Sequence, residues 1–170
     1  VVLVGHSYAA FVITGVADRA PDKIGHLVYF DTFVPKDGES MAAVVGFLIG
    51  VFRRQARRRG DGWRIDPPAR NNFGVRDAAD LKWLRSLVTP QPLKSFEEPL
   101  RLQDPQIVTR FPRSHFSCTG RGVLVDLVRK LSPRSRPSEP GWRLRELATG
   151  HDAMITMPNE TAALLLECAT

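Results

Sequence analysis

The sequence has little of what marks disulfide-rich, metal-binding or membrane-spanning proteins. It contains 2 cysteines in 170 residues, Cys118 and Cys168, and no group of Cys and His has the spacing of a metal site. So few cysteines are typical of a reducing compartment, and we expect a cytoplasmic protein. No segment approaches the roughly 20 apolar residues that cross a bilayer, and no secretory signal is visible. We therefore expect no disulfide framework, no bound metal and no membrane partner.

The chain is also short of acidic residues relative to basic ones. Its 24 Lys and Arg outnumber 18 Asp and Glu, which leaves a formal net charge of +6. Such an excess can indicate a nucleic-acid partner. The densest arginine cluster is one segment, residues 53–59, and neither an aromatic stacking pattern nor a known nucleic-acid motif accompanies it. We interpret this segment as a basic helix and expect no nucleic-acid partner.

Apolar residues recur with two different periods at the start of the chain. Residues 1–4 form a continuous apolar run typical of a buried parallel strand. Residues 8–20 have helical spacing that ends before Pro21, and residues 26–30 predict another strand. A strand, a helix and a strand in close succession make a βαβ unit. The chain is therefore predicted to be an α/β protein with a mostly parallel sheet flanked by helices.

The remaining residues divide into an insertion and the rest of the sheet. Residues of about 35–99 show no strand alternation and predict helices instead, over 41–52 and 77–87. After residue 100 the pattern predicts strands near 115–118 and 142–147 and helices at 123–131 and about 159–168. We expect a single α/β domain whose core comprises residues 1–34 and 100–170, with a helical cap at about 35–99.

The segment Gly5-His6-Ser7-Tyr8-Ala9 lies where the first strand passes into the first helix. A serine hydroxyl becomes a strong nucleophile only when a neighbouring base takes its proton, and it must stand clear of the sheet. A sharp strand-to-helix turn achieves this, and it needs small residues two before and two after the serine. The following helix directs its positive dipole end toward charge that develops beside the serine. The pattern therefore predicts Ser7 as the nucleophile of a serine hydrolase.

The same segment and the residues 11–17 after it resemble the esterase and hydroxynitrile-lyase branch of the α/β-hydrolases. Residues 27–35, 87–93 and 149–154 resemble that branch as well, in the family's order. The resemblance implies an eight-stranded, mostly parallel sheet, a helical cap over the site and no cofactor. It also implies that the amide of Tyr8 is one donor of the oxyanion hole.

Measured against this family, the chain starts late. About seventy N-terminal residues are absent, with half of the sheet, the strands that flank the nucleophile strand and the loop of the second oxyanion donor. We expect a fragment, a shifted reading frame, or a homo-oligomer in which another copy completes the sheet. Losing one oxyanion donor costs about a hundredfold to a thousandfold in rate.

Four histidines are candidates for the base that activates Ser7. His151 follows the last predicted strand on a turn at Gly150, which is the position of the catalytic histidine in the family. That position also agrees with the chain order Ser, acid, His. His6 lies inside the turn, where its neighbour Ser7 points elsewhere, and His26 and His115 are interpreted as structural residues.

The acid that orients His151 is left between two candidates. The family usually places it after the strand near 115–118, where this chain has no carboxylate until Asp126. Asp31 instead ends the strand after the nucleophile helix, at the edge where functional groups of α/β sheets gather. Asp31 is favoured over Asp126. Asp152 is expected to point away from the ring of His151.

The sequence predicts a small-molecule carboxylic ester as substrate, hydrolysed through an acyl-enzyme. Tyr8 and Trp83 are predicted to contact it, and Phe47, Phe52 and Leu84 are further apolar candidates. Two alternatives remain. One is an inactive fragment or pseudo-hydrolase that binds small apolar ligands. The other is a hydroxynitrile lyase. It is disfavoured because those enzymes place a lysine soon after the catalytic histidine, whereas here His151 is followed by Asp152-Ala153-Met154.

Overall fold

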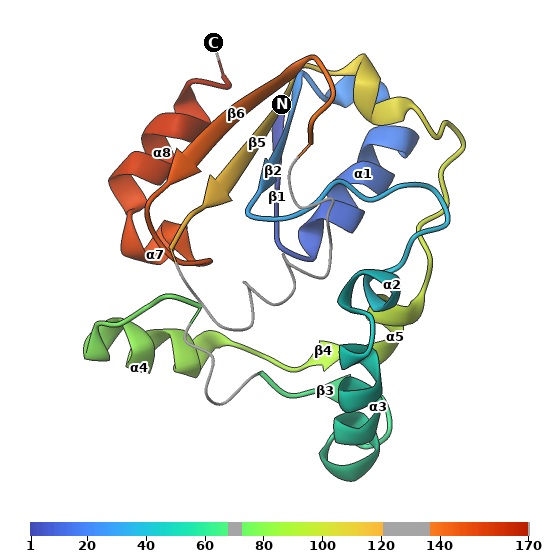
Figure 1. Ribbon diagram of the computed structural model, residues 1–170, viewed down its shortest axis with the longest axis vertical. Helices are drawn as coiled ribbons and strands as arrows, with labels where there is room; N and C mark the ends of the chain where they lie inside the picture. The colour runs from blue at the N-terminus through green and yellow to red at the C-terminus, as the bar shows by residue number, and fades with distance from the viewer. Residues whose placement is uncertain (68–72, 121–136, 170) are drawn as a thin grey trace.

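The computed structural model describes residues 1–67, 73–120 and 137–169. They form a four-stranded parallel sheet in the order β1-β2-β5-β6, with helices on both faces (Figure 1). The strands are β1 (Val2–His6), β2 (His26–Phe30), β5 (Arg113–Cys118) and β6 (Trp142–Leu147). Because all four run the same way, their carboxyl ends meet at one edge of the sheet.

The first face of the sheet is covered by α1 (Ala9–Arg19). Its small and branched side chains, Ala10, Ile13 and Ala17, pack on Leu27 and Tyr29 of β2. Every residue of β2 is buried, as expected of a strand with a neighbour on each side and layers on both faces. A short 3-10 turn, η1 (Pro21–Lys23), connects α1 to β2, and η2 (Ile107–Arg110) precedes β5.

The opposite face is covered by the C-terminal helices α7 (Ala153–Thr156) and α8 (Pro158–Leu166). In Figure 1 they lie beside β6, on the other side of the sheet from α1. A second apolar cluster joins them to the sheet and includes Val28, Phe30, Phe116 and Leu147. The sheet is therefore the central layer of three.

An insertion between β2 and β5 lies beyond the carboxyl edge of the sheet (Figure 1). Its elements are α2 (Met41–Val45), α3 (Leu48–Arg59), β3 (Arg64–Ile65), α4 (Ala78–Leu87), β4 (Gln91–Pro92) and α5 (Leu93–Glu97). We refer to it as the cap. The prediction of a purely helical cap is wrong in one respect, because β3 and β4 pair as an antiparallel ribbon. Strands of two residues are too short to show alternation in a sequence.

Two other expectations differ from the structure. The single helix predicted over 41–52 is interrupted at Gly46, which adopts φ 56° and separates α2 from α3. The nucleophile strand was expected to lack both flanking strands, but β2 pairs with all of β1 from Val2 to His6. On the side away from β2, β1 has no neighbouring strand among the described residues, so it forms an edge of the sheet.

Some expectations fall outside the described residues, namely the helix at 123–131 and Asp126, which lies within it. In the parts of the chain that the structure describes, no helix is both long enough and apolar enough to span a membrane.

Candidate active site

Ser7 directly follows β1 in a backbone conformation that non-glycine residues rarely adopt. Its φ is 54°, in the left-handed region. The Ser7 amide donates to the carbonyl oxygen of Phe30 at 3.2 Å, and the Thr32 hydroxyl donates to the Ser7 carbonyl at 2.7 Å. Within the described residues the Ser7 hydroxyl itself has no hydrogen-bond partner. The strained turn is thus held by β2, and the hydroxyl stays available.

Gly5 shows why this turn needs small residues. A Cβ on Gly5 would lie 2.9 Å from the carbonyl oxygen of Ala9 and 2.9 Å from the side chain of Ile13. β1 and α1 therefore approach each other closely on both sides of Ser7. Tyr8 is the N-cap residue of α1, so its amide is among those with no partner inside the helix.

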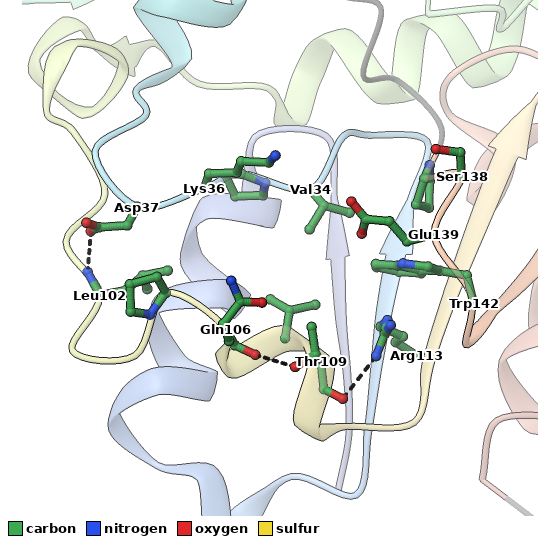
Figure 2. A pocket seen from close by; sticks show the side chains of 14 residues that line it. Val34, Lys36, Asp37, Leu102, Gln106, Thr109, Arg113, Ser138, Glu139 and Trp142 are labelled. Carbon is green, nitrogen blue, oxygen red and sulfur yellow. Dashed lines mark hydrogen bonds between the residues drawn. The ribbon is translucent and has the colours of Figure 1, made fainter.

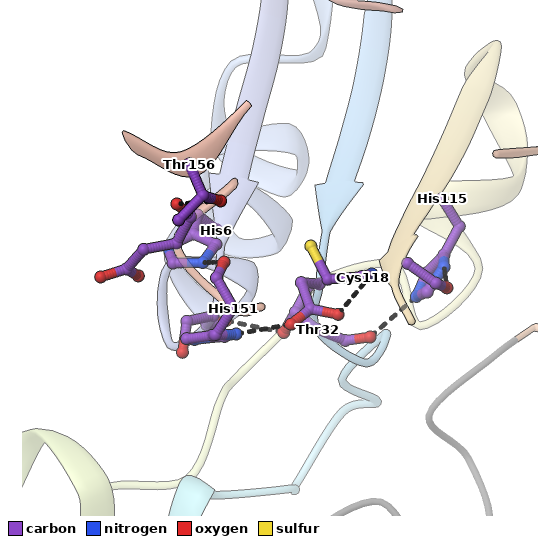
Figure 3. Close-up of polar contacts among 10 residues, drawn as sticks. His6, Thr32, His115, Cys118, His151 and Thr156 are labelled. Atoms are coloured by element: carbon purple, nitrogen blue, oxygen red, sulfur yellow. Dashed lines mark hydrogen bonds and ion pairs between the residues drawn. The ribbon is translucent and has the colours of Figure 1, made fainter. Parts of the chain in front are cut away.

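Asp31 directly follows β2 and also has a left-handed backbone, with φ 42°. Its amide donates to Phe116 at 2.7 Å, and its Oδ1 accepts from the amide of Cys118 at 2.9 Å. Its Oδ2 lies 2.6 Å from Nδ1 of His151 (Figure 3). β5 therefore fixes one carboxylate oxygen, and the other oxygen is directed at the histidine ring.

The bond to Asp31 determines which nitrogen of His151 carries hydrogen. A carboxylate only accepts, so Nδ1 is the donor and Nε2 is the nitrogen that can take up a proton. The two side chains are 11% and 2% exposed, which keeps water away from this contact. The pair has the geometry of a general base oriented by an acid.

The turn that carries His151 is held by two consecutive cap residues, Phe73 and Gly74. The amide of Asp152 donates to the carbonyl oxygen of Phe73 at 3.0 Å, which ties the turn to the cap. Gly74 and Gly150 are in such close contact that a Cβ on either would clash with the backbone of the other. The ring of Phe73 also lies 5.7 Å from the ring of His151.

His6 and Asp152 complete a cluster of ionisable groups around His151. The rings of His6 and His151 are 4.3 Å apart, centroid to centroid. Burial and the neighbouring charge of His151 lower the pKa of His6 from 6.5 to about 4. Burial, reinforced by the charge of Asp31, raises the pKa of Asp152, which is 8% exposed. A carboxylate oxygen of Asp152 lies within 4.8 Å of a ring nitrogen of His151, so Asp152 does not point away from that ring, as the sequence predicted.

His6, His151 and Asp152 also form the group in the described residues whose spacing would suit a metal ion. One ligand atom from each lies within 4.8 Å of the others. One nitrogen of each ring is already used, Nε2 of His6 by the carbonyl of His151 and Nδ1 of His151 by Asp31. Since Nδ1 of His151 is bonded to Asp31, a metal ion here would occupy Nε2 of His151, the nitrogen that a general base needs for the proton, so the two uses of this group exclude each other.

The cap supplies an apolar wall beside Ser7. Tyr8 packs against Phe96 of α5, with ring centroids 5.3 Å apart, and its hydroxyl donates to the carbonyl oxygen of Ser95 at 3.0 Å. The surrounding cluster is entirely apolar and consists of Phe11, Phe33, Met41, Val45, Phe52 and Leu100 among others. Trp83, predicted to contact substrate, lies on α4 with 55% of its surface exposed; Phe47, another candidate, is 65% exposed.

A separate cavity of about 600 Å³ lies near the amino ends of β5 and β6 (Figure 2). Arg113 projects beside it, donates to the carbonyl oxygens of Thr109 and Pro140, and stacks on Trp142 at 5.1 Å. These contacts connect η2, β5 and β6. Since Ser7 lies at the opposite ends of the strands, we assign this cavity no part in the chemistry.

The sequence did not reveal the contacts that hold the site together. His115 is a structural residue, as interpreted: it is 1% exposed and donates from Nε2 to the carbonyl oxygen of Thr32 at 2.7 Å. The amide of Cys118 holds Asp31, and Phe73 holds the turn of His151. Each acts through a backbone group or across a long sequence separation, so no residue pattern announces it. His6 had one signal, its position next to Ser7.

Residues 1–164 match the alpha/beta hydrolase family. A carbendazim-hydrolysing esterase of Nocardioides sp. (strain SG-4G) is 34% identical over an alignment of 185 positions. The alignment covers 97% of this chain and 69% of that esterase.

Among solved structures, an extracellular alpha/beta-hydrolase from a Paenibacillus species superposes with a TM-score of 0.75 at 23% identity. The match covers 98% of this chain and 71% of that protein. A mutant of tomato methylketone synthase I gives 0.71 at 18% identity, covering 99% and 70% of the two chains. At these identities the structural likeness concerns the fold alone.

Proposed function

Because this chain belongs to the alpha/beta hydrolase family, we propose that it is a carboxylic-ester hydrolase that works through Ser7, His151 and Asp31. The observation that carries the proposal is the hydrogen bond between Asp31 and His151, formed at the same edge of the sheet as the strained turn of Ser7. The similarity to an esterase supports the reaction class.

The proposed reaction has two halves. In the first, Nε2 of His151 takes the proton of Ser7 as its oxygen attacks the ester carbonyl carbon. The amide of Tyr8 donates to the oxyanion of the tetrahedral intermediate. The intermediate collapses, the carbon–oxygen bond to the alcohol breaks, and His151 returns the proton to the departing alcohol. Ser7 is left as an acyl ester.

In the second half, His151 deprotonates a water molecule that attacks the acyl carbonyl, and the acid leaves as Ser7 recovers its proton. Asp31 keeps its charge throughout and stabilises the imidazolium that forms in both halves. The apolar wall of Tyr8 and Phe96 supports a substrate with an apolar acyl or alcohol group.

A fluorophosphonate probe tests this proposal, since it reacts with a serine only when the serine is activated. We expect labelling of the wild type, no labelling of Ser7→Ala, and hydrolysis of p-nitrophenyl butyrate that follows the labelling. Ser86→Ala is the matched control, because Ser86 is an exposed serine on α4. An unlabelled, inactive wild type would overturn the proposal in favour of a non-catalytic protein. Cyanide release from mandelonitrile without ester hydrolysis would favour a lyase instead.

A further inference from the structure

The side chain of His6 lies between the strand of the nucleophile and the ring of the base (Figure 3). Its ring centroid is 4.3 Å from that of His151, with 39° between the ring planes. Phe30 also meets the ring edge-on, with a centroid distance of 5.8 Å. These two ring contacts restrict the position of the His6 ring.

One hydrogen bond joins His6 to the backbone of His151. Nε2 of His6 is 3.0 Å from the carbonyl oxygen of His151, across 145 residues of sequence. A carbonyl oxygen only accepts, so Nε2 must carry the hydrogen. Other ties of this turn come from Asp31 after β2, from the cap through Phe73, and from the loop after β5, where the amide of Gly120 donates to the carbonyl oxygen of Thr149 at 2.7 Å. His6 therefore provides the tie to β1, the strand that leads directly into Ser7.

His6 also stays neutral while His151 changes charge. Burial and the charge on His151 hold the pKa of His6 at about 4, whereas the carbonyl of His151 and the charge of Asp31 oppose this shift. At neutral pH the ring of His6 is therefore uncharged. The Nε2–H donor of His6 is present in both protonation states of the base.

We propose that His6 is a positioning residue that fixes His151 relative to Ser7. This inference rests on the proposed function, because it assigns His151 the role of base. Ser7 and His6 are consecutive residues, so one side chain connects the nucleophile turn to the turn of the base. Rates of this kind fall steeply when reacting groups are displaced, by about a hundredfold for 1 Å.

Two amide substitutions test the inference with matched chemistry. Gln places its side-chain nitrogen where Nε2 of His6 lies, whereas Asn is one methylene shorter and does not reach the carbonyl. We expect His6→Gln to keep kcat within a few-fold and His6→Asn to lower it by about tenfold to a hundredfold. KM should change less than twofold, because His6 is not part of the substrate wall. The acidic limb of the pH–rate profile should shift in His6→Asn and be restored in His6→Gln.

His26 provides the control for a general loss of stability. It is also a buried histidine, 5% exposed, and its Nε2 makes one side-chain hydrogen bond of 2.9 Å, to Ser114. It lies at the amino end of β2, remote from Ser7. His26→Asn should lower the unfolding midpoint without changing kcat or the pH–rate profile.

A spectroscopic measurement separates this inference from the proposed function. The proton between Nδ1 of His151 and Asp31 should give a low-field ¹H resonance that His6→Gln retains and His6→Asn shifts or broadens. If both variants keep the wild-type kcat, pH profile and resonance while the wild type is labelled by the probe, the positioning role of His6 is wrong and the hydrolase proposal stands. If the wild type is not labelled but the resonance still responds to His6→Asn, the hydrolase proposal fails and the coupling between His6 and His151 stands.

Discussion

Nδ1 of His151 lies 2.6 Å from Oδ2 of Asp31, although 120 residues separate them along the chain. The contact forms because β2 and β6 are parallel strands of one sheet, so their carboxyl ends lie at the same edge. β5 lies between them and contributes the amide of Cys118, which holds the other oxygen of Asp31. β5 thus fixes the position of Asp31 independently of the contact with His151.

This contact predicts that substitution of Asp31 will affect activity much more than substitution of Asp152 or Asp126. Asp31→Asn should lower ester hydrolysis by about a thousandfold or more, because the amide no longer selects the reactive tautomer of His151. Asp152→Asn and Asp126→Asn should each retain activity within about tenfold. Steady-state kinetics on p-nitrophenyl butyrate measure all three. A large loss in Asp126→Asn together with an active Asp31→Asn would reverse the assignment of the acid.

The contact between Gly74 and Gly150 predicts a penalty for any side chain there. Gly150→Ala would bring a Cβ into the backbone of Gly74, and we expect a loss of about 1–3 kcal/mol in the free energy of unfolding. Activity should fall too, because the turn of His151 must shift. Gly50→Ala is the matched control. Gly50 lies in α3 with nothing within 4 Å of an added Cβ, so alanine should stabilise the helix by about 0.5–1 kcal/mol. Urea unfolding of both variants measures the difference.

The contacts of Tyr8 with Ser95 and Phe96 of the cap predict how substitutions of Tyr8 will change stability and KM. Tyr8→Phe keeps the ring packed on Phe96 and removes only the hydroxyl, so we expect a loss of about 1 kcal/mol in stability. Tyr8→Ala also removes the aromatic contacts, and KM for an apolar ester should rise more than in Tyr8→Phe. Equal KM values in the two variants would argue against Tyr8 as part of the substrate wall.

The lowered pKa of His6 predicts that the folded protein becomes less stable as the solution becomes more acidic. The unfolded chain binds a proton at this residue below about 6.5 and the folded chain only below about 4, so stability decreases as the pH falls through that window. For this residue the decrease is at most about 3.4 kcal/mol. Asp152 acts in the opposite direction, because its raised pKa means that protonation favours the folded state. The difference between wild type and His6→Gln isolates the contribution of His6.

Urea unfolding at pH 7 and pH 4.5 measures this difference. His6→Gln should be less stable than the wild type at pH 7 and should lose part of that deficit at pH 4.5. A deficit that is constant over the pH range would show that His6 is not held neutral by the fold.

Much of the fold could be predicted from the sequence because it depends on local patterns. The apolar run before Gly5 and the helical spacing after Tyr8 placed β1, α1 and the turn of Ser7 within a residue or two of their observed bounds. The prediction of a parallel α/β sheet is confirmed, as is a helix with Asp77 at its N-terminus. The β3–β4 ribbon and the interruption at Gly46 were missed, since two-residue strands and a single left-handed glycine leave no periodic signal.

By itself, the sequence predicted the sharp turn at Ser7, because Gly5, Ser7 and Ala9 lie close together in the chain and their spacing reflects the local geometry. It also proposed His151 and Asp31 from their places after strands, although it could not choose between Asp31 and Asp126 as the acid. Only the tertiary structure decided that Asp31 reaches Nδ1 of His151 and that His6 holds the carbonyl of the same residue. Both contacts span more than a hundred residues, so they depend on strand order and register, which bring distant residues to one edge of the sheet.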